Sequence, residues 1–282
     1  MLNNNIQAFI GCTASYTESH NVIFGAPFDS TTSYRPGARF GSRAIRSESY
    51  GIETYSPYQD KDLEDARIFD SGDLELCIGD VQIALAQIEE CASDILSGGK
   101  RPVMLGGEHL VTLGVLRAMA REYPDLHLIH FDAHADLRDD YLGARLSHAT
   151  VMRRAWDIFG DGRIHQFGIR SGERNEFLFS DKHTEMHKFN FDGLANTVHA
   201  LHGKPVYFTL DLDVLDPSVF PGTGTPEAGG VCFTALLKAI QTIATLNIIG
   251  LDLVELSPPY DQSGMSTIVA CKLLRETLLA LL

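Results

Sequence analysis

The sequence predicts an α/β fold in which helices flank a mostly parallel β-sheet of about eight strands. Short apolar runs alternate with helical patterns along the whole chain of 282 residues, as in parallel sheets covered by helices. No repeat, low-complexity segment or linker rich in proline and serine divides the chain. We therefore expect one domain over residues 1–282. The alternation by itself fits a closed barrel and an open three-layer sheet equally well.

Eight segments have the length and apolar composition of strands. The first ends at Pro27, and one of the most strand-like ends in Asp211. The predicted strands are residues 22–26, 66–70, 102–105, 126–132, 163–167, 184–188, 205–210 and 247–253.

Helices and long loops occupy the segments between these strands. Apolar residues recur at helical spacing from Val81 to Ile95, and Gly98 ends that helix. Ser147 is a suitable N-cap for the helix that follows it. The other predicted helices are residues 110–121, 149–159, 234–244 and 265–281, with further helical connections around 163–188. Long irregular segments are expected at residues 29–46, 133–147 and 217–230, and loops of this length are usually functional.

The charge balance argues against nucleic acid and anionic membranes as partners. The chain has 23 basic and 37 acidic residues, a net charge of −14, whereas those partners bind basic patches. An acidic protein suits a small cationic substrate, although many soluble enzymes are acidic without one.

The five cysteines are far apart and form no Cys-x-x-Cys pair, so we expect free thiols rather than disulfides or a zinc knuckle. Residues Met1 to Asn5 do not include a basic region followed by an apolar one. No apolar run reaches the roughly 20 residues that a membrane span needs. We therefore expect a cytoplasmic protein.

Asp132, His134 and Asp136 follow one predicted strand at every second position. In an extended segment, residues two apart point to the same side, so these three side chains can converge on one metal ion. One imidazole between two carboxylates suits Mn²⁺, Fe²⁺ or Zn²⁺ better than Ca²⁺.

Further polar residues that carry chemistry lie at the ends of other strands. His109, Asp211, Asp213 and Glu255 each lie at or just past the end of a predicted strand. The carboxyl ends of parallel strands share one edge of the sheet, where ligands bind. The resulting group of histidines and aspartates suffices for two metal ions that share bridging carboxylates.

With these motifs in place, the chain resembles the ureohydrolases, the family of arginases and agmatinases, from about Val22 to its C-terminus. The matching segments occur in the family's order: Gly106-Gly107-Glu108-His109, Asp132-Ala133-His134-Ala135-Asp136, Ser147-His148-Ala149-Thr150, Asp211-Leu212-Asp213-Val214-Leu215-Asp216-Pro217, Gly222-Thr223-Gly224-Thr225-Pro226 and Asp252-Leu253-Val254-Glu255. Ala135 and Ala149 depart from the commonest residues, and neither departure removes a ligand.

The resemblance implies an open three-layer α/β/α sheet, a trimer or hexamer, and two Mn²⁺ ions per subunit. The implied ligands are His109 and Asp136 on one ion, His134 and Asp213 on the other, and Asp132 and Asp211 shared by both.

The resemblance also implies hydrolysis of a guanidino group. Two bridging cations lower the pKa of a bound water, so that a hydroxide between the metals attacks the guanidino carbon and yields urea and an amine. His148 is expected to transfer a proton to the leaving amine. Glu255 is expected to pair with the guanidinium, and Thr225 to add a contact. Asp136 belongs with His148 and Glu255 to the expected catalytic residues.

The loop at residues 139–146 is expected to select the substrate. Asp139 and Asp140 suit a substrate whose far end is cationic, which favours agmatine, cleaved to putrescine and urea in polyamine biosynthesis. The alternative within the family is arginine, guanidinobutyrate or a similar guanidino acid, with its carboxylate held by Arg35, Arg39 or Arg145. More remote alternatives are a metallo-amidohydrolase of the deacetylase type, although the adjacent histidine pair of that class is absent, and a non-catalytic metal-binding homologue.

Overall fold

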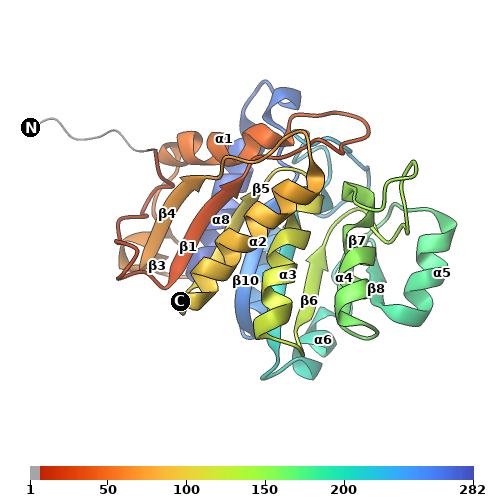
Figure 1. The fold of residues 1–282 in the computed structure, drawn as a ribbon. Coiled ribbons are helices and arrows are strands. Elements are labelled where there is room, and N and C mark those ends of the chain that lie inside the picture. The colour runs from red at the N-terminus through yellow and green to blue at the C-terminus, as the bar shows by residue number, and fades with distance from the viewer. Residues whose placement is uncertain (1–6) are drawn as a thin grey trace, which may run out of the picture.

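The central element is an open eight-stranded sheet (Figure 1), seen in a computed structural model that describes residues 7–282. Its strand order is β4-β1-β5-β10-β9-β6-β7-β8, and every pairing within it is parallel. Because β4 and β8 are edge strands that do not pair with each other, the sheet is open and not a barrel. The expectation based on Met1 to Asn5 concerns residues that lie outside the described part of the chain.

All eight predicted strands are present, with small shifts at their ends. Their bounds are β1 (Asn21–Ala26), β4 (Ile68–Asp73), β5 (Arg101–Gly106), β6 (His127–Phe131), β7 (Ile164–Ile169), β8 (Glu185–Lys188), β9 (Pro205–Asp211) and β10 (Asn247–Val254). A two-stranded antiparallel pair, β2 (Tyr55–Ser56) and β3 (Lys61–Asp62), was not predicted.

Helices cover both faces of the sheet and complete three layers (Figure 1). One layer comprises α2 (Val81–Ser97), α3 (Thr112–Glu122), α4 (Val151–Phe159) and α5 (Arg174–His183). The other comprises α1 (Gly41–Glu48), α6 (Leu194–Ala200), α7 (Phe233–Ile243) and α8 (Met265–Ala280). Neighbouring strand residues point into opposite cores, since Ile23 packs with the second layer and Phe24 with the first. The predicted three-layer fold is confirmed.

The expectation of an irregular segment at residues 29–46 is wrong for its second half. A 3₁₀ turn, Ala38–Phe40, leads there into α1. This helix buries Ile45, and the Arg46 guanidinium is 2.8 Å from Asp70 Oδ2. The sequence of α1 shows no clear apolar periodicity because the ion pair of Arg46 and Asp70, and not an apolar side chain, occupies part of its buried face.

Two further helices begin later than predicted because 3₁₀ turns precede them. His109–Val111 precedes α3, and His148–Thr150 precedes α4. Ser147 is the N-cap of the second turn, and its N–H donates to Thr150 Oγ1 at 3.0 Å. Both histidines therefore lie in short turns between a strand or loop and a helix.

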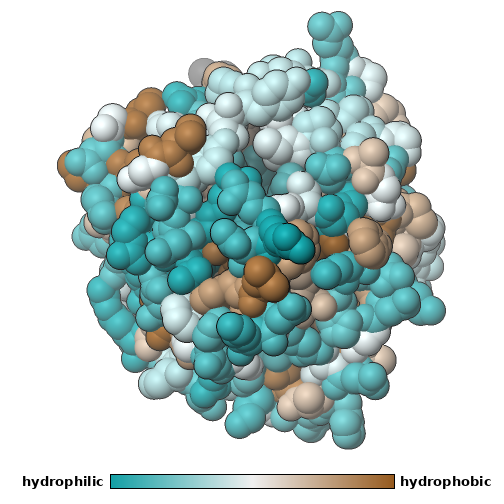
Figure 2. Space-filling model, turned by 90° about the vertical axis from the view of Figure 1, so that its right-hand side faces the viewer, coloured by the Kyte–Doolittle hydropathy of each residue, from teal (hydrophilic) through white to brown (hydrophobic). Residues whose placement is uncertain are grey.

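The face that carries α5 and β8 is mostly hydrophilic, with a small group of hydrophobic residues near its centre (Figure 2). This agrees with the acid-rich composition. No helix among residues 7–282 is long and apolar enough to cross a membrane.

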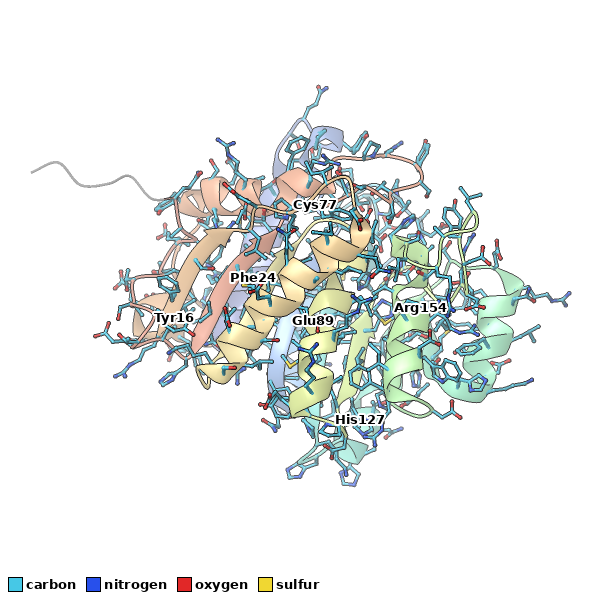
Figure 3. All side chains as sticks on the ribbon, in the orientation of Figure 1. Tyr16, Phe24, Cys77, Glu89, His127 and Arg154 are labelled. Atoms are coloured by element: carbon cyan, nitrogen blue, oxygen red, sulfur yellow. The ribbon has the colours of Figure 1, made fainter. Side chains whose placement is uncertain are left out.

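Histidines also gather at the amino end of the sheet. His127, at the start of β6 (Figure 3), has its Nδ1 3.1 Å from His165 Nε2. Glu185 contacts the other nitrogen of His165 at 2.5 Å and His187 Nε2 at 2.9 Å. These side chains satisfy one another's hydrogen bonds. Within the described part of the chain, the groups of side chains that could hold a metal ion lie at the opposite, carboxyl end of the sheet.

Candidate metal centre and pocket

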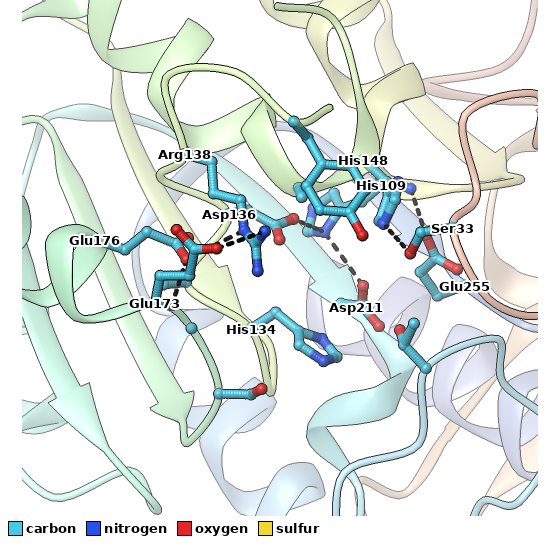
Figure 4. Close-up of a pocket in the computed structure, with 16 residues that line it drawn as sticks. Ser33, His109, His134, Asp136, Arg138, His148, Glu173, Glu176, Asp211 and Glu255 are labelled. Carbon is cyan, nitrogen blue, oxygen red and sulfur yellow. Dashed lines mark hydrogen bonds and ion pairs between the residues drawn. The ribbon is translucent and has the colours of Figure 1, made fainter. Parts of the chain in front are cut away.

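A pocket of about 270 Å³ lies at the carboxyl edge of the sheet, where the adjacent strands β5, β10, β9 and β6 end (Figure 4). Asp132 and Asp213 are buried and contact the histidines of its floor. The other predicted site residues that line it are His109, His134, Asp136, His148, Asp211, Thr225 and Glu255. The structure therefore brings every predicted metal ligand to one place.

The predicted ligands form two groups that share Asp132. His109 Nδ1 is 3.0 Å from Asp132 Oδ2, 3.2 Å from Asp211 Oδ2 and 3.4 Å from Asp136 Oδ2. His134 Nδ1 is 3.0 Å from Asp213 Oδ2 and 3.5 Å from Asp132 Oδ1. Asp132 thus presents one oxygen to each group, as a bridging ligand must.

The Asp211 carboxylate faces the histidine of only one of the two groups, His109. Its Oδ2 faces His109, whereas its Oδ1 accepts a hydrogen bond from the Asp213 N–H at 2.8 Å. The predicted sharing of Asp211 between two ions therefore stays a prediction, and the geometry gives Asp132 the clearer bridging position.

The buried Nδ1 of His109 has no hydrogen-bond partner. The other ring nitrogen, Nε2, is 2.8 Å from Thr209 Oγ1, whose own proton is donated to Asp252 Oδ1 at 2.7 Å. In a neutral imidazole, Nε2 must therefore carry the proton and Nδ1 a lone pair. A lone pair that faces several carboxylate oxygens is repelled by them unless a proton or a metal cation lies between. Although burial lowers the pKa of His109, Asp132 and Asp211 accordingly raise it well above its ordinary value, and the same arrangement fits a metal ion.

The carboxylates of the cluster also repel one another. Burial, together with the charge of Asp132, raises the pKa values of Asp136 and Asp211 well above their ordinary value. Divalent cations offset this repulsion and favour the ionised carboxylates that a metal site needs.

Two of the acidic residues of the pocket have strained backbone conformations. Asp136 and Glu255 have φ values of 53° and 67°, in the left-handed region that costs non-glycine residues about 1–3 kcal/mol. The Glu255 N–H donates to Gly107 O at 2.9 Å, and its Oε1 accepts from the His109 N–H at 2.7 Å. A side chain at Gly107 is excluded, because a Cβ there would lie 1.9 Å from Phe28 O.

Glu255 is a buried carboxylate at the inner end of the pocket. Burial, and then the charges of Glu108 and Asp213, raise its pKa to about 8. Such a group gains most from a cationic partner, because a positive charge restores the ionised form.

His148 lies at the rim of the pocket between two hydroxyl groups. Its Nε2 is 3.2 Å from Ser33 Oγ, its Nδ1 is 3.2 Å from Ser147 Oγ, and its N–H donates to Thr31 Oγ1 at 3.0 Å. Burial lowers its pKa to about 4, so the ring is neutral near pH 7 and can accept and return a proton. The Tyr141 ring packs edge-on against it at 5.7 Å.

Thr225 lines the pocket, and its hydroxyl is 3.5 Å from Asp213 Oδ2. Asp139 and Asp140, in contrast, do not line this pocket but a separate hollow beside it. Asp139 is largely exposed and pairs with Arg154 at 2.7 Å, and Asp140 accepts from the Gly143 N–H at 3.1 Å. The structure therefore does not bring these two aspartates to the substrate side of the loop.

The far wall of the pocket holds acidic residues that the sequence analysis missed. Glu173 and Glu176 line it together with Arg138 (Figure 4). They lie at the start of α5, soon after β7 ends, and the Glu173 N–H donates to Glu176 Oε2 at 2.6 Å. The rule that ligands gather at strand ends applies to β7 as well and could have indicated them.

Comparisons with known proteins agree on one family. Residues 19–280 match the arginase family. An agmatinase from Bacillus anthracis is 48% identical over 278 residues, covering 97% of this chain and 96% of that protein. A mitochondrial guanidino acid hydrolase from Homo sapiens is 36% identical and covers 92% of this chain and 78% of that protein. A solved structure from Clostridium difficile has a TM-score of 0.93 and 52% identity, with 95% of this chain and 98% of that chain covered.

Proposed function

The chain belongs to the arginase family, and we propose that it is an agmatinase, a metal-dependent hydrolase that cleaves the guanidino group of agmatine to putrescine and urea. Several agmatinases align with it over 97% of its length. The observation that carries the substrate assignment is a pocket with a carboxylate at each end, Glu255 inside and Glu173 at the far wall (Figure 4). Agmatine has a cationic group at each of its ends.

The metal in this proposal is Mn²⁺, with two ions per subunit. His109 and Asp136 would hold one ion, His134 and Asp213 the other, and Asp132 both, with Asp211 as a second shared carboxylate. Imidazole and carboxylate donors suit this ion. When bound, a pair of divalent cations makes hydroxide available from water near neutral pH.

Glu255 holds the guanidinium in place for attack. A carboxylate can accept two parallel hydrogen bonds from the planar group, which fixes its orientation as well as its position. The pKa of Glu255 is about 8 in the free pocket. A bound guanidinium lowers it and so keeps the carboxylate ionised during the reaction.

His148 relays the proton that the leaving amine requires, because the neutral ring can take up a proton from solvent on one nitrogen and pass one on from the other. The ring is at the rim of the pocket, beside Ser33, which also lines it. Ser33 can pass a proton between His148 Nε2 and a group in the pocket, because a hydroxyl both donates and accepts.

The far wall favours a cationic tail over a carboxylate. Arg138 Nη1 is 3.0 Å from Glu173 Oε1, and its Nε is 3.5 Å from Glu176 Oε2. Glu176 also accepts from the Leu137 and Glu173 N–H groups, whereas the Glu173 side chain is 59% exposed. Glu173 is therefore free to exchange Arg138 for a substrate ammonium.

The cations considered for a guanidino acid do not line the pocket. Arg39 pairs with Asp29, and Arg145 Nη2 is 3.3 Å from Asp157 Oδ2. Arg35 stacks on neighbouring tyrosine rings. Among the described residues, Arg138 is the one arginine or lysine that lines the pocket, and it is paired with Glu173.

Urea release tests this proposal when Mn²⁺-loaded protein is offered agmatine, arginine and guanidinobutyrate side by side. We expect agmatine to give the highest kcat/KM. A preference for a guanidino acid would refute the substrate assignment alone, and absence of urea from all three would refute the ureohydrolase assignment.

Glu173→Gln is expected to raise the KM for agmatine about fivefold with little change in kcat, because an exposed ion pair is worth roughly 1 kcal/mol. Initial rates of urea release give both constants. Asp139→Asn is the matched control, since it removes an exposed aspartate of the neighbouring hollow and should leave KM unchanged. If Asp139→Asn raised KM and Glu173→Gln did not, the far wall would be wrongly assigned.

We further propose, as the sequence analysis predicted, that the protein acts in the cytoplasm as a homotrimer or homohexamer and contributes to polyamine biosynthesis. Light scattering of the purified protein gives its molecular mass in solution and so distinguishes a trimer from a hexamer.

A further inference from the structure

A buried hydrogen-bond chain leads from β7 to Asp132 through His130, a residue of β6 that the sequence analysis did not consider. His130 is fully buried and does not line the pocket. Its Nε2 is 2.7 Å from Asp132 Oδ2, and its Nδ1 is 3.0 Å from Gln166 Nε2. Together with His109 and Asp132 it forms one of the groups whose spacing could hold a metal ion. The position of its ring proton decides whether it binds the metal or the carboxylate.

The partners of Gln166 fix that proton. Gln166 Nε2 is 2.8 Å from Ala135 O, a carbonyl that can only accept, so this end of the side chain is the amide nitrogen. Gln166 Oε1 accepts from Thr184 Oγ1 at 3.2 Å, which agrees with that orientation. The two amide hydrogens are therefore donated to Ala135 O and to His130 Nδ1.

Because His130 Nδ1 accepts a hydrogen bond, the neutral ring carries its proton on Nε2. That proton points at Asp132 Oδ2. A protonated Nε2 has no lone pair for a metal, so His130 is a donor to Asp132 and not a ligand.

We infer that His130 is a positioning residue that fixes the plane of the Asp132 carboxylate. The inference rests on the proposed function only in taking Asp132 as a ligand of both ions. Asp132 Oδ1 accepts from the His134 N–H at 2.5 Å, and Oδ2 is held by His130 and lies 3.0 Å from His109 Nδ1. The carboxylate is thereby held with one oxygen toward each group of ligands, before any metal binds.

Mn²⁺ affinity and stoichiometry, measured by equilibrium dialysis of the purified full chain, test this inference without substrate. His130→Leu should weaken Mn²⁺ binding about 10–100-fold, the usual cost of losing a group that orients a ligand. His130→Gln keeps a side-chain N–H near the Nε2 position and should restore most of the affinity. Gln166→Leu, which frees the ring proton to move to Nδ1, should weaken binding to a smaller extent.

His127→Gln is the matched control, because His127 lies on the same strand at the opposite end of the sheet (Figure 3). Wild-type affinity in His130→Leu would overturn the inference. So would the loss of one whole metal equivalent in both His130→Leu and His130→Gln, because His130 would then be a ligand.

Nitrogen NMR of histidine-labelled wild-type protein gives a second readout. Only His130→Gln is needed beside it, to assign the signals of the His130 ring. We expect a protonated Nε2 and an unprotonated Nδ1 in the metal-free protein, and the reverse would contradict the inference. Failure of the proposed function would appear differently, as wild-type protein that binds Mn²⁺ but releases no urea.

Discussion

Asp132→Ala is expected to abolish binding of both metal ions and to reduce urea release by roughly 10³-fold or more. Asp132 contacts both histidine groups, so its loss removes a ligand from each ion and leaves His109 Nδ1 without its nearest carboxylate oxygen. Metal catalysis contributes several kcal/mol to the barrier reduction, and each 1.36 kcal/mol is a factor of ten in rate. Metal analysis of the dialysed variant, run beside the activity assay, measures both effects.

Two further substitutions make the Asp132→Ala result specific. Asp213→Ala should weaken mainly the His134 group, because Asp213 Oδ2 lies 3.0 Å from His134 Nδ1. Asp216→Asn should keep both ions, since Asp216 is a turn residue whose carboxylate accepts from Ser218 and from glycine N–H groups. Two ions retained in Asp132→Ala would contradict its bridging position.

His148→Ala is expected to lower kcat by about 10²–10⁴-fold while both metal ions stay bound, since this is the usual contribution of a general acid or base. The ring contacts hydroxyl groups and an aromatic ring at the rim, and no metal-ligand contact would be lost. Steady-state kinetics and metal analysis separate the two effects. Added imidazole should restore part of the rate, because it can enter the space left by the side chain.

His183→Ala is the matched control for His148→Ala. His183 is the last residue of α5 and pairs with Asp161, away from the pocket. It should change neither kcat nor metal content. Loss of metal in His148→Ala at unchanged folding would show that the residue helps hold the ions instead of transferring a proton.

The centre of the site was predictable because two simple geometric rules act there together. Residues at alternate positions of an extended segment share a side, which placed Asp132, His134 and Asp136 together. Parallel strands end at one edge of the sheet, which added His109 and Asp213. In the structure these residues follow β5, β6 and β9, within a run of four adjacent strands. The second rule needs no knowledge of loop conformation. The first held only in its outcome, because β6 ends just before Asp132, and Asp136, with a φ of 53°, lies in the loop that follows.

The walls of the pocket depend on loop conformation, and there the sequence was insufficient. Asp139 and Asp140 are close to the ligands in sequence, but a loop has no fixed period that directs its side chains. The chain reverses at Leu142, which has a φ of 52°, and Asp139 turns to Arg154. Glu173 reaches the pocket as the N-cap residue of α5, in the segment that follows β7, where no predicted metal ligand lies.

The role of His130 was hidden for a related reason. Its partner Gln166 lies on β7, directly across from it in the register of the two strands. The order and register of parallel strands are set by tertiary packing and cannot be read from the apolar runs alone. Once that register is known, the direction of each hydrogen bond follows from the donor and acceptor inventory of the side chains.

The most direct test of the two-ion centre is anomalous diffraction at the manganese edge from crystals of the Mn²⁺-loaded protein. We predict two peaks per chain, one beside His109 Nδ1 and one beside His134 Nδ1, with the Asp132 carboxylate between them. A single peak in fully active protein, or two peaks away from Asp132, would contradict the bridging position of Asp132.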